Sequence, residues 1–136
     1  TKFWAVAALK PEGIQIPRIP IIPGLLQFVY AENTGAAFSF MTGKTFLLGL
    51  ISLAATIGLS WFWYSLPARE KWGRAAAAMI LSGAVGNMID RFARGYVVDF
   101  IDAYWKTHHW PTFNVADSLI CVGAAILAVR FLQGKI

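Results

Sequence analysis

The residues best suited to chemistry in this sequence are two aspartates in apolar surroundings. Asp99 lies between Val98 and Phe100, where the loss of water disfavours the ionised carboxylate and raises its pKa. Asp117 follows Asn114 by three residues, which predicts a helix start whose N-terminus favours the Asp117 anion. Two carboxylates of different proton affinity that share a water can activate that water and protonate a leaving amine. Asp99 and Asp117 are therefore candidates for acid–base chemistry.

Two further patches carry polar groups that are costly at membrane depth and are therefore candidates for function. One is Asn33-Thr34-Gly35-Ala36-Ala37-Phe38, and the other is Gly86-Asn87-Met88-Ile89-Asp90-Arg91. Plainer structural roles stay open for the candidates: a strand-end or turn position for Asp99, a helix cap for Asp117, an ion pair of Asp90 with Arg91, and a turn at Asn33-Thr34-Gly35.

The composition indicates that lipid surrounds most of the chain. Of its 136 residues, 57% are hydrophobic and 14% are charged, whereas roughly a quarter of a soluble protein is charged. The seven acidic and twelve basic residues lie in short intervals between long uncharged runs. The net charge of +5 does not indicate nucleic-acid binding, because the basic residues are scattered and form no stripe. Their placement is typical of segments beside a membrane.

Other kinds of catalytic site find no support in the sequence. It contains no G-x-S-x-G, no H-E-x-x-H and no phosphate-binding glycine loop. His108 and His109 are adjacent, which is not the spacing of a zinc motif, so we expect them at the membrane interface. Cys121 is the single cysteine, and we expect it to be a small buried residue of the last helix. We expect neither a metal nor a cofactor.

Three stretches of the chain predict membrane-spanning helices. Residues 44–66 carry no charge after Lys44 and are long enough to cross the hydrocarbon core. Residues 67–74 form a short basic connection, which the positive-inside rule places in the cytoplasm. Residues 75–91 are rich in Gly and Ala, which predicts close helix packing. Residues 113–133 then predict the helix that returns to the cytoplasmic side.

The remaining segments complete an all-α polytopic membrane protein of one domain, residues 1–136. Residues 1–9 are too short to span and predict the end of a truncated first helix, so we expect four transmembrane helices in the intact protein. We expect no cleavable signal peptide, because this stretch has neither a basic leader nor a small-residue cleavage site. Residues 10–43 and 92–112 are then extracytoplasmic. In the first, the apolar runs Leu25–Tyr30 and Ala36–Met41 predict a hairpin or small sheet at the membrane surface.

The polar patches resemble the signature blocks of a known family. Asn33-Thr34-Gly35-Ala36-Ala37-Phe38, Gly86-Asn87-Met88-Ile89-Asp90-Arg91, Val97-Val98-Asp99-Phe100 and Phe113-Asn114-Val115-Ala116-Asp117-Ser118, in this order, resemble those of the lipoprotein signal peptidases, also called signal peptidase II. The resemblance covers essentially the whole chain. Thr1-Lys2 looks like the end of a family D-Q-x-x-K stretch, whose aspartate this sequence lacks, so that family position is not assigned.

This resemblance implies an intramembrane aspartyl protease of four helices with an extracytoplasmic β-cradle and a mobile extracytoplasmic segment. The implied substrate is a diacylglyceryl prolipoprotein, cut on the N-terminal side of its lipidated cysteine. The implied location is the bacterial cytoplasmic (inner) membrane, with the site near its extracytoplasmic face, and we expect a monomer in contact with membrane lipid. Asp99 and Asp117 are the implied catalytic pair, with substrate contacts from Asn33, Gly35, Asn87, Arg91 and Asn114 and support from Asp90 and Ala116.

Two other classes of protein explain intramembrane polar residues as well. A small transporter or proton relay also places Asp, Asn and Arg in the membrane, but the sequence shows neither an inverted repeat nor a broken helix. A lipid-binding scaffold would use Arg91 and the aromatic residues, and it predicts that replacing either aspartate leaves its function intact.

Overall fold

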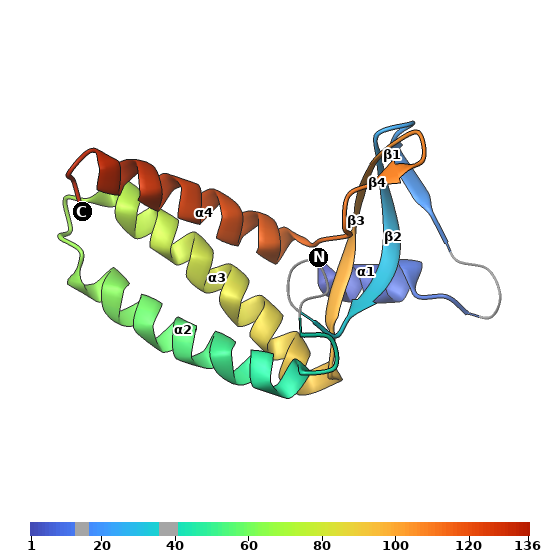
Figure 1. Ribbon diagram of the computed structural model, residues 1–136, viewed down its shortest axis with the longest axis horizontal. Helices are drawn as coiled ribbons and strands as arrows, with labels where there is room; N and C mark the ends of the chain where they lie inside the picture. The colour runs from blue at the N-terminus through green and yellow to red at the C-terminus, as the bar shows by residue number, and fades with distance from the viewer. Residues whose placement is uncertain (13–16, 36–40) are drawn as a thin grey trace.

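Three long helices form a bundle, and a small sheet and a short helix lie at one end of it (Figure 1). The computed structural model describes residues 1–12, 17–35 and 41–136. The helices are α1 (Lys2–Leu9), α2 (Thr45–Ser65), α3 (Lys71–Arg94) and α4 (Val115–Leu132). The strands are β1 (Ile19–Ile22), β2 (Leu26–Asn33), β3 (Val97–Trp105) and β4 (His108–His109). The predicted combination of helices with a small sheet is therefore confirmed.

Helix α3 packs between α2 and α4, and small residues allow the close approach. A Cβ atom built on Gly123 of α4 would lie 2.7 Å from the Ala76 carbonyl oxygen of α3. A Cβ atom on Gly83 of α3 would collide with the Ala116 carbonyl oxygen of α4. Since Ala116 directly precedes Asp117, the Gly83 contact sets how near the start of α4 comes to α3.

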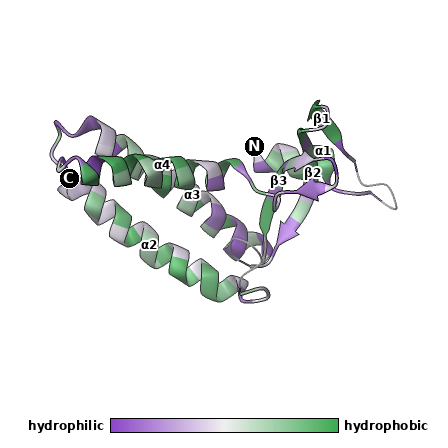
Figure 2. Cartoon of the chain, turned by 45° about the horizontal axis from the view of Figure 1, so that its top comes forward, coloured by the Kyte–Doolittle hydropathy of each residue, from purple (hydrophilic) through white to green (hydrophobic). Residues whose placement is uncertain are grey.

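Two of the described helices, α2 and α4, are long and apolar enough to cross a membrane. Hydrophobic residues cover both, whereas hydrophilic residues gather at the end of α3 near the sheet (Figure 2). Helix α3 begins at Lys71 and not at the predicted residue 75, because the Glu70 side chain accepts a hydrogen bond from Gly73 N and caps the helix earlier. It also continues three residues past 91, to Arg94, and ends at Gly95, whose φ of 79° closes the helix.

The four strands form one antiparallel sheet in the order β1, β2, β3, β4. Between β2 and β3 the register shifts: Phe28 pairs with Ile101, but Ala31 pairs with Asp99. Strand β2 thus carries one extra residue at this point, which is the geometry of a β-bulge. Phe113 forms an isolated bridge with Ile101, and this bridge ties the start of α4 to β3.

Helix α1 covers one face of the sheet and makes its hydrophobic core. Ala5 and Leu9 of α1 are fully buried and pack against Val98 and Phe100 of β3. The Trp4 ring meets the Phe100 ring edge to face, 6.4 Å between centroids. With this face of the sheet filled by apolar contacts, strand alternation directs Asp99 to the other face.

Two detailed expectations change in the structure. Glu32 and Asn33 belong to strand β2, which pairs with β1 and β3, and they do not form a hairpin turn. The second run predicted for the hairpin, Ala36–Met41, begins with residues 36–40, which lie outside the described residues. The expectation that Cys121 is buried is wrong, since it is exposed on α4. Helix α4 packs through Gly123, and a residue two positions away points about 200° around the helix.

Candidate active site

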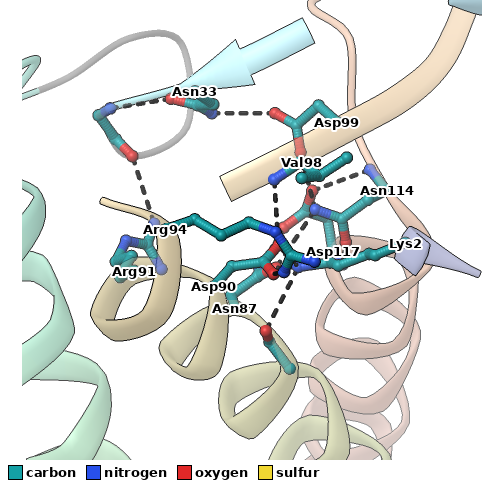
Figure 3. A network of polar contacts seen from close by, with 12 residues as sticks. Lys2, Asn33, Asn87, Asp90, Arg91, Arg94, Val98, Asp99, Asn114 and Asp117 are labelled. Atoms are coloured by element: carbon teal, nitrogen blue, oxygen red, sulfur yellow. Dashed lines mark hydrogen bonds and ion pairs between the residues drawn. The ribbon is translucent and has the colours of Figure 1, made fainter. Parts of the chain in front are cut away.

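Asp99 is held at the bundle end of the sheet by two asparagine side chains (Figure 3). Its Oδ2 accepts a hydrogen bond from Asn33 Nδ2 at 3.0 Å, and its Oδ1 accepts one from Asn114 Nδ2 at 2.7 Å. Asp99 is 2% exposed and Asn114 is fully buried. Strand β2 and the start of α4 therefore fix both oxygens of this carboxyl.

Asp117 is held by the start of its own helix and by α3. Asn114 Oδ1 accepts a hydrogen bond from Asp117 N at 3.1 Å, and Asp117 Oδ2 accepts one from Asn114 N at 3.0 Å, which is a reciprocal capping box. The capping role that the sequence left open therefore exists. It occupies Oδ2, while Oδ1 accepts a hydrogen bond from Asn87 Nδ2 of α3 at 2.8 Å.

Asn114 joins the two aspartates. Its side chain donates to Asp99 and its backbone N–H donates to Asp117, so both carboxyl groups contact the same residue. Asn114 Nδ2 also donates to Asn87 Oδ1 at 3.2 Å. Residues from β2, β3, α3 and α4 thus meet in one network, and it contains the predicted residues Asn33, Asn87, Asp99, Asn114 and Asp117.

The electrostatics of the cluster separate Asp99 from an ordinary carboxyl group. Burial disfavours its ionised form and raises its pKa to about 6. The hydrogen bonds from Asn114 and Asn33 act in the opposite direction, and the nearby negative charge of Asp117 adds to the increase. Asp99 therefore exchanges its proton much closer to neutrality than a solvated aspartate does.

Asp90 supports the cluster from α3. In the described structure it pairs with Lys2 and Arg94, and not with Arg91, the ion pair that the sequence left open. Its Oδ1 lies 2.6 Å from Arg94 Nη1, and its Oδ2 accepts a hydrogen bond from Val98 N at 3.0 Å. The reason is helical geometry, because residues four apart share a face and adjacent residues do not. Asp90 thereby ties the end of α3 to β3, next to Asp99.

Arg91 extends towards the loop after β2. Its Nη2 donates to the Gly35 carbonyl oxygen at 3.2 Å, and Gly35 N donates to Asn33 Oδ1 at 2.9 Å. Among residues 1–12, 17–35 and 41–136, its buried Nε has no hydrogen-bond partner. Ala116 is buried on α4, against α3 at Gly83.

Two sets of polar contacts were not predicted from the sequence, those of Lys2 and those of Asp102. Lys2 Nζ lies 2.7 Å from Asn87 Oδ1 and 2.8 Å from Asp90 Oδ2. A charge at the start of an apolar stretch was the available signal. Farther along the sheet, Asp102 accepts a hydrogen bond from Gln27 Nε2 at 2.6 Å and lies 2.8 Å from His109 Nδ1. No spacing rule pairs those side chains, because the strand register brings them together.

Nothing in the described part of the chain is arranged as a metal site. Within it, no group of three or more His, Cys, Asp or Glu side chains could hold a metal ion. The donors around Asp99 and Asp117 are amide N–H groups, and these bind carboxylates and peptide carbonyls and not cations.

Comparisons with known proteins agree with one another. Residues 1–133 match the family described as signal peptidase (SPase) II. A lipoprotein signal peptidase of Geobacter metallireducens is 44% identical over 121 residues, which cover 86% of this chain and 74% of the relative. One of Vibrio vulnificus is 47% identical over 123 residues, 87% of this chain and 72% of the relative.

Two solved structures of bacterial membrane enzymes share the fold. A bacterial membrane enzyme determined by the in meso method at 2.3 Å resolution superimposes with a TM-score of 0.85 and 29% identity, over 97% of this chain and 78% of that one. A second, determined at 1.9 Å, gives a TM-score of 0.79 and 27% identity, over 97% and 84%. The fold, the ordered polar blocks and the sequence relatives lead to one conclusion: the chain belongs to the signal peptidase II family.

Proposed function

We propose that this protein is an intramembrane aspartyl endopeptidase that removes the signal peptide from diacylglyceryl prolipoproteins, with Asp99 and Asp117 as its catalytic pair. The observation that carries the proposal is the bridging of both carboxyl groups by the buried Asn114. The relatives named lipoprotein signal peptidase supply the substrate class.

The two carboxyl groups are suited to different parts of the reaction. Each oxygen of Asp99 and Asp117 accepts one amide hydrogen bond, which leaves acceptor positions for a shared water. Asp117 takes a proton from the water as the water oxygen attacks the peptide carbonyl carbon. Asp99, whose raised pKa of about 6 keeps a fraction of it protonated near neutrality, gives its proton to the carbonyl oxygen. As the tetrahedral intermediate collapses and the C–N bond breaks, Asp117 gives the proton that it took from the water to the departing amine nitrogen. One hydroxyl group of the intermediate returns a proton to Asp99 as the carbonyl group of the new carboxyl end forms.

Uncharged amides and one arginine are available to hold the peptide in place. The side chains of Asn33, Asn87 and Asn114 surround the carboxyl groups without competing for their protons. Arg91 Nε, buried and without a partner in the described residues, can donate to a substrate carbonyl group. Gly35, which follows β2, contacts Arg91 through its carbonyl oxygen and can offer its backbone to the peptide.

The proposed orientation places the sheet outside the cytoplasm and the opposite end of the bundle inside it. Arg69, Lys71, Arg74, Arg130 and Lys135 lie at or near that opposite end, in agreement with the positive-inside rule. The site then lies near the outer face of the bacterial inner membrane. We propose four spans with α1 as the end of the first, one domain over residues 1–136, and a monomer. The site opens sideways to lipid, because moving an acyl chain into water costs about 0.8 kcal/mol per CH₂ group.

The test compares three carboxyl-to-amide substitutions on β3 and α4 in purified protein. Asp99→Asn and Asp117→Asn should each reduce cleavage of a lipidated precursor by about 10²- to 10⁴-fold, because an amide cannot transfer the proton. Asp102→Asn is the matched control: it removes a buried carboxylate of the same strand, and cleavage should stay within about twofold.

Two results would contradict the proposal. Substantial turnover by either Asp99→Asn or Asp117→Asn would assign that residue a structural role. Equal cleavage of precursors with and without the diacylglyceryl group, in the same bilayer, would remove lipid from the recognised substrate.

A further inference from the structure

Lys2 is the cation in direct contact with the amide that holds Asp117. Its Nζ lies 2.7 Å from Asn87 Oδ1 and 3.4 Å from the Gly86 carbonyl oxygen (Figure 3). The Lys2 side chain is 13% exposed, so its ammonium group is largely removed from solvent. Eighty-five positions separate Lys2 from Asn87, and the contact therefore joins α1 to α3.

The ammonium group determines which way the Asn87 amide points. An asparagine side chain ends in one acceptor and one donor of similar size, so its two orientations differ only in hydrogen bonding. Lys2 only donates, and it therefore requires Oδ1 on its own side. The donor Nδ2 is then directed at Asp117 Oδ1, 2.8 Å away. The opposite orientation would face Nδ2 to the ammonium group and Oδ1 to the carboxylate, and both contacts would be repulsive.

One further contact keeps the ammonium group in place, and another keeps the Asn87 amide in its orientation. Asp90 Oδ2 lies 2.8 Å from Lys2 Nζ, and Asp90 is itself held by Arg94 and by the Val98 N–H. Asn114 Nδ2 also donates to Asn87 Oδ1, which reinforces the same amide orientation. The Lys2 position is thus fixed independently of Asp117.

We propose that Lys2 is a positioning residue, whose ammonium group fixes the Asn87 amide so that its N–H stays on the Asp117 carboxylate. This inference rests on the proposed function, in which Asp117 accepts a proton from the attacking water. Lys2 itself contacts neither Asp99 nor Asp117 through a hydrogen bond in the described structure, and it acts through Asn87.

A double-mutant cycle tests this connection. Lys2→Met should lower kcat by about 10- to 100-fold with little change in KM, because a misplaced donor affects the chemical step. The Lys2→Met/Asn87→Ala double variant should be no slower than Asn87→Ala alone, since Lys2 has no amide left to orient. Lys10→Met is the control: Lys10 follows the same helix, is about half exposed, and contacts Glu32 at 3.8 Å, and its loss should leave kcat within about twofold.

The pH profile separates this role from simple stabilisation. The positive charge of Lys2 also lowers the pKa of Asp99. In Lys2→Met the descending limb of kcat/KM should therefore move to higher pH, while Lys10→Met should not move it. Lys2→Arg, which keeps the charge and donates hydrogen bonds, should restore the position of the limb and part of the lost kcat. Lys2→Gln serves as the neutral variant if Lys2→Met does not fold.

Each outcome is decisive for one claim. Wild-type kcat in a folded Lys2→Met or Lys2→Gln variant, or fully additive losses in the double-mutant cycle, would overturn the inference about Lys2. If Asp99→Asn and Asp117→Asn are inactive in that same experiment, the proposed function stands and only this inference fails. Activity in either aspartate variant would remove the proposed function first.

Discussion

Helices α3 and α4 begin at opposite ends of the bundle, and each begins with a side chain that caps its first turn. Glu70 caps α3, and both its oxygens also bind Arg130, at 2.7 and 2.6 Å. The hydrogen bond from Arg130 lowers the Glu70 pKa. At α4, Asp117 receives its hydrogen bonds from the Asn114 backbone and the Asn87 amide, and the adjacent Asp99 has a pKa raised to about 6.

The difference shows what makes a buried carboxyl group available for chemistry. A bidentate arginine keeps Glu70 ionised and geometrically fixed, which suits a structural joint between α3 and α4. Amide donors orient Asp99 without neutralising it, so burial determines its proton affinity. Capping geometry alone therefore does not distinguish the two ends of the bundle. The hydrogen-bond partner of the carboxyl group does, because it is an arginine at Glu70 and amide groups at Asp99.

The strongest test of this comparison removes the residue that bridges the two carboxyl groups. Asn114→Ala deletes the cap of α4 and the hydrogen bond to Asp99 together, so cleavage should fall by about 100-fold or more. Loss of the cap should also lower the free energy of unfolding by about 1–2 kcal/mol. Ser118→Ala, one turn later, removes a weaker bond to Asn114 O and is the control for both measurements. Retention of full cleavage by Asn114→Ala would show that the side-chain half of the bridge, the hydrogen bond to Asp99, is not required.

A second test concerns the dependence of stability on pH. The Asp99 pKa is raised to about 6 on folding, so the folded protein binds this proton more tightly than the unfolded chain does. Relative to Asp99→Asn, wild type should lose stability as pH rises from about 4 to about 6, by up to about 3 kcal/mol. Unfolding titrations of both proteins in one detergent measure this. A difference that does not change with pH would mean that burial leaves Asp99 with an ordinary proton affinity.

The pH dependence of the catalytic rate should also report the protonation of Asp99, which acts in its protonated form. Because Asp99 must carry its proton, kcat/KM should fall as pH rises through about 6, the pKa of this carboxyl in the free protein. Asn33→Ala removes a hydrogen bond that lowers the Asp99 pKa, so this pKa should rise further and the descending limb should move to higher pH. If the limb keeps its position in an active Asn33→Ala variant, it reports the titration of another residue.

A smaller effect should come from the helix contact beneath Asp117. In Gly83→Ala the new methyl group meets the Ala116 carbonyl oxygen, so α4 must shift; cleavage should fall about tenfold, with about 1–3 kcal/mol of lost stability. Gly58→Ala on α2 has no atom within 4 Å of the new methyl group and should leave both quantities nearly unchanged. Equal behaviour of the two variants would indicate that the start of α4 tolerates displacement.

The smallest effect on cleavage is expected at the other capping residue. Glu70→Gln weakens the Arg130 pair but keeps an oxygen that can cap Gly73, so melting temperature should fall while kcat/KM stays within about twofold. Thermal unfolding and cleavage assays on one preparation measure both. A large loss of cleavage at unchanged stability would mean that the two ends of the bundle are coupled.

Hydropathy predicted the long helices, and the polar patches predicted most residues of the candidate site. The uncharged run after Lys44 and the Asn114 helix start were readable because each depends on neighbouring residues. The gathering of Asn33, Asn87 and Asp99 followed from placing their segments on one side of a membrane.

The features that were missed depend on contacts between distant parts of the chain. The bulge between Phe28 and Ala31 shifts the register of β2 against β3 ahead of Asn33, and no local pattern specifies it. Lys2 resembles the end of a family D-Q-x-x-K stretch, but its contact with Asp90 becomes apparent only when α1 is placed beside α3. Cys121 was misjudged because its burial depends on which face of α4 meets α3.

The distribution of the network along the chain has a consequence for biosynthesis. Its described members run from Lys2 in α1 to Asp117 in α4, and Asn114 is among the last of them to be translated. A nascent chain that has already delivered Asp99 to the membrane still lacks the second carboxylate. Under the proposed mechanism, proteolytic competence therefore arises only after α4 has inserted, and a translation product interrupted before residue 114 is harmless to neighbouring nascent proteins.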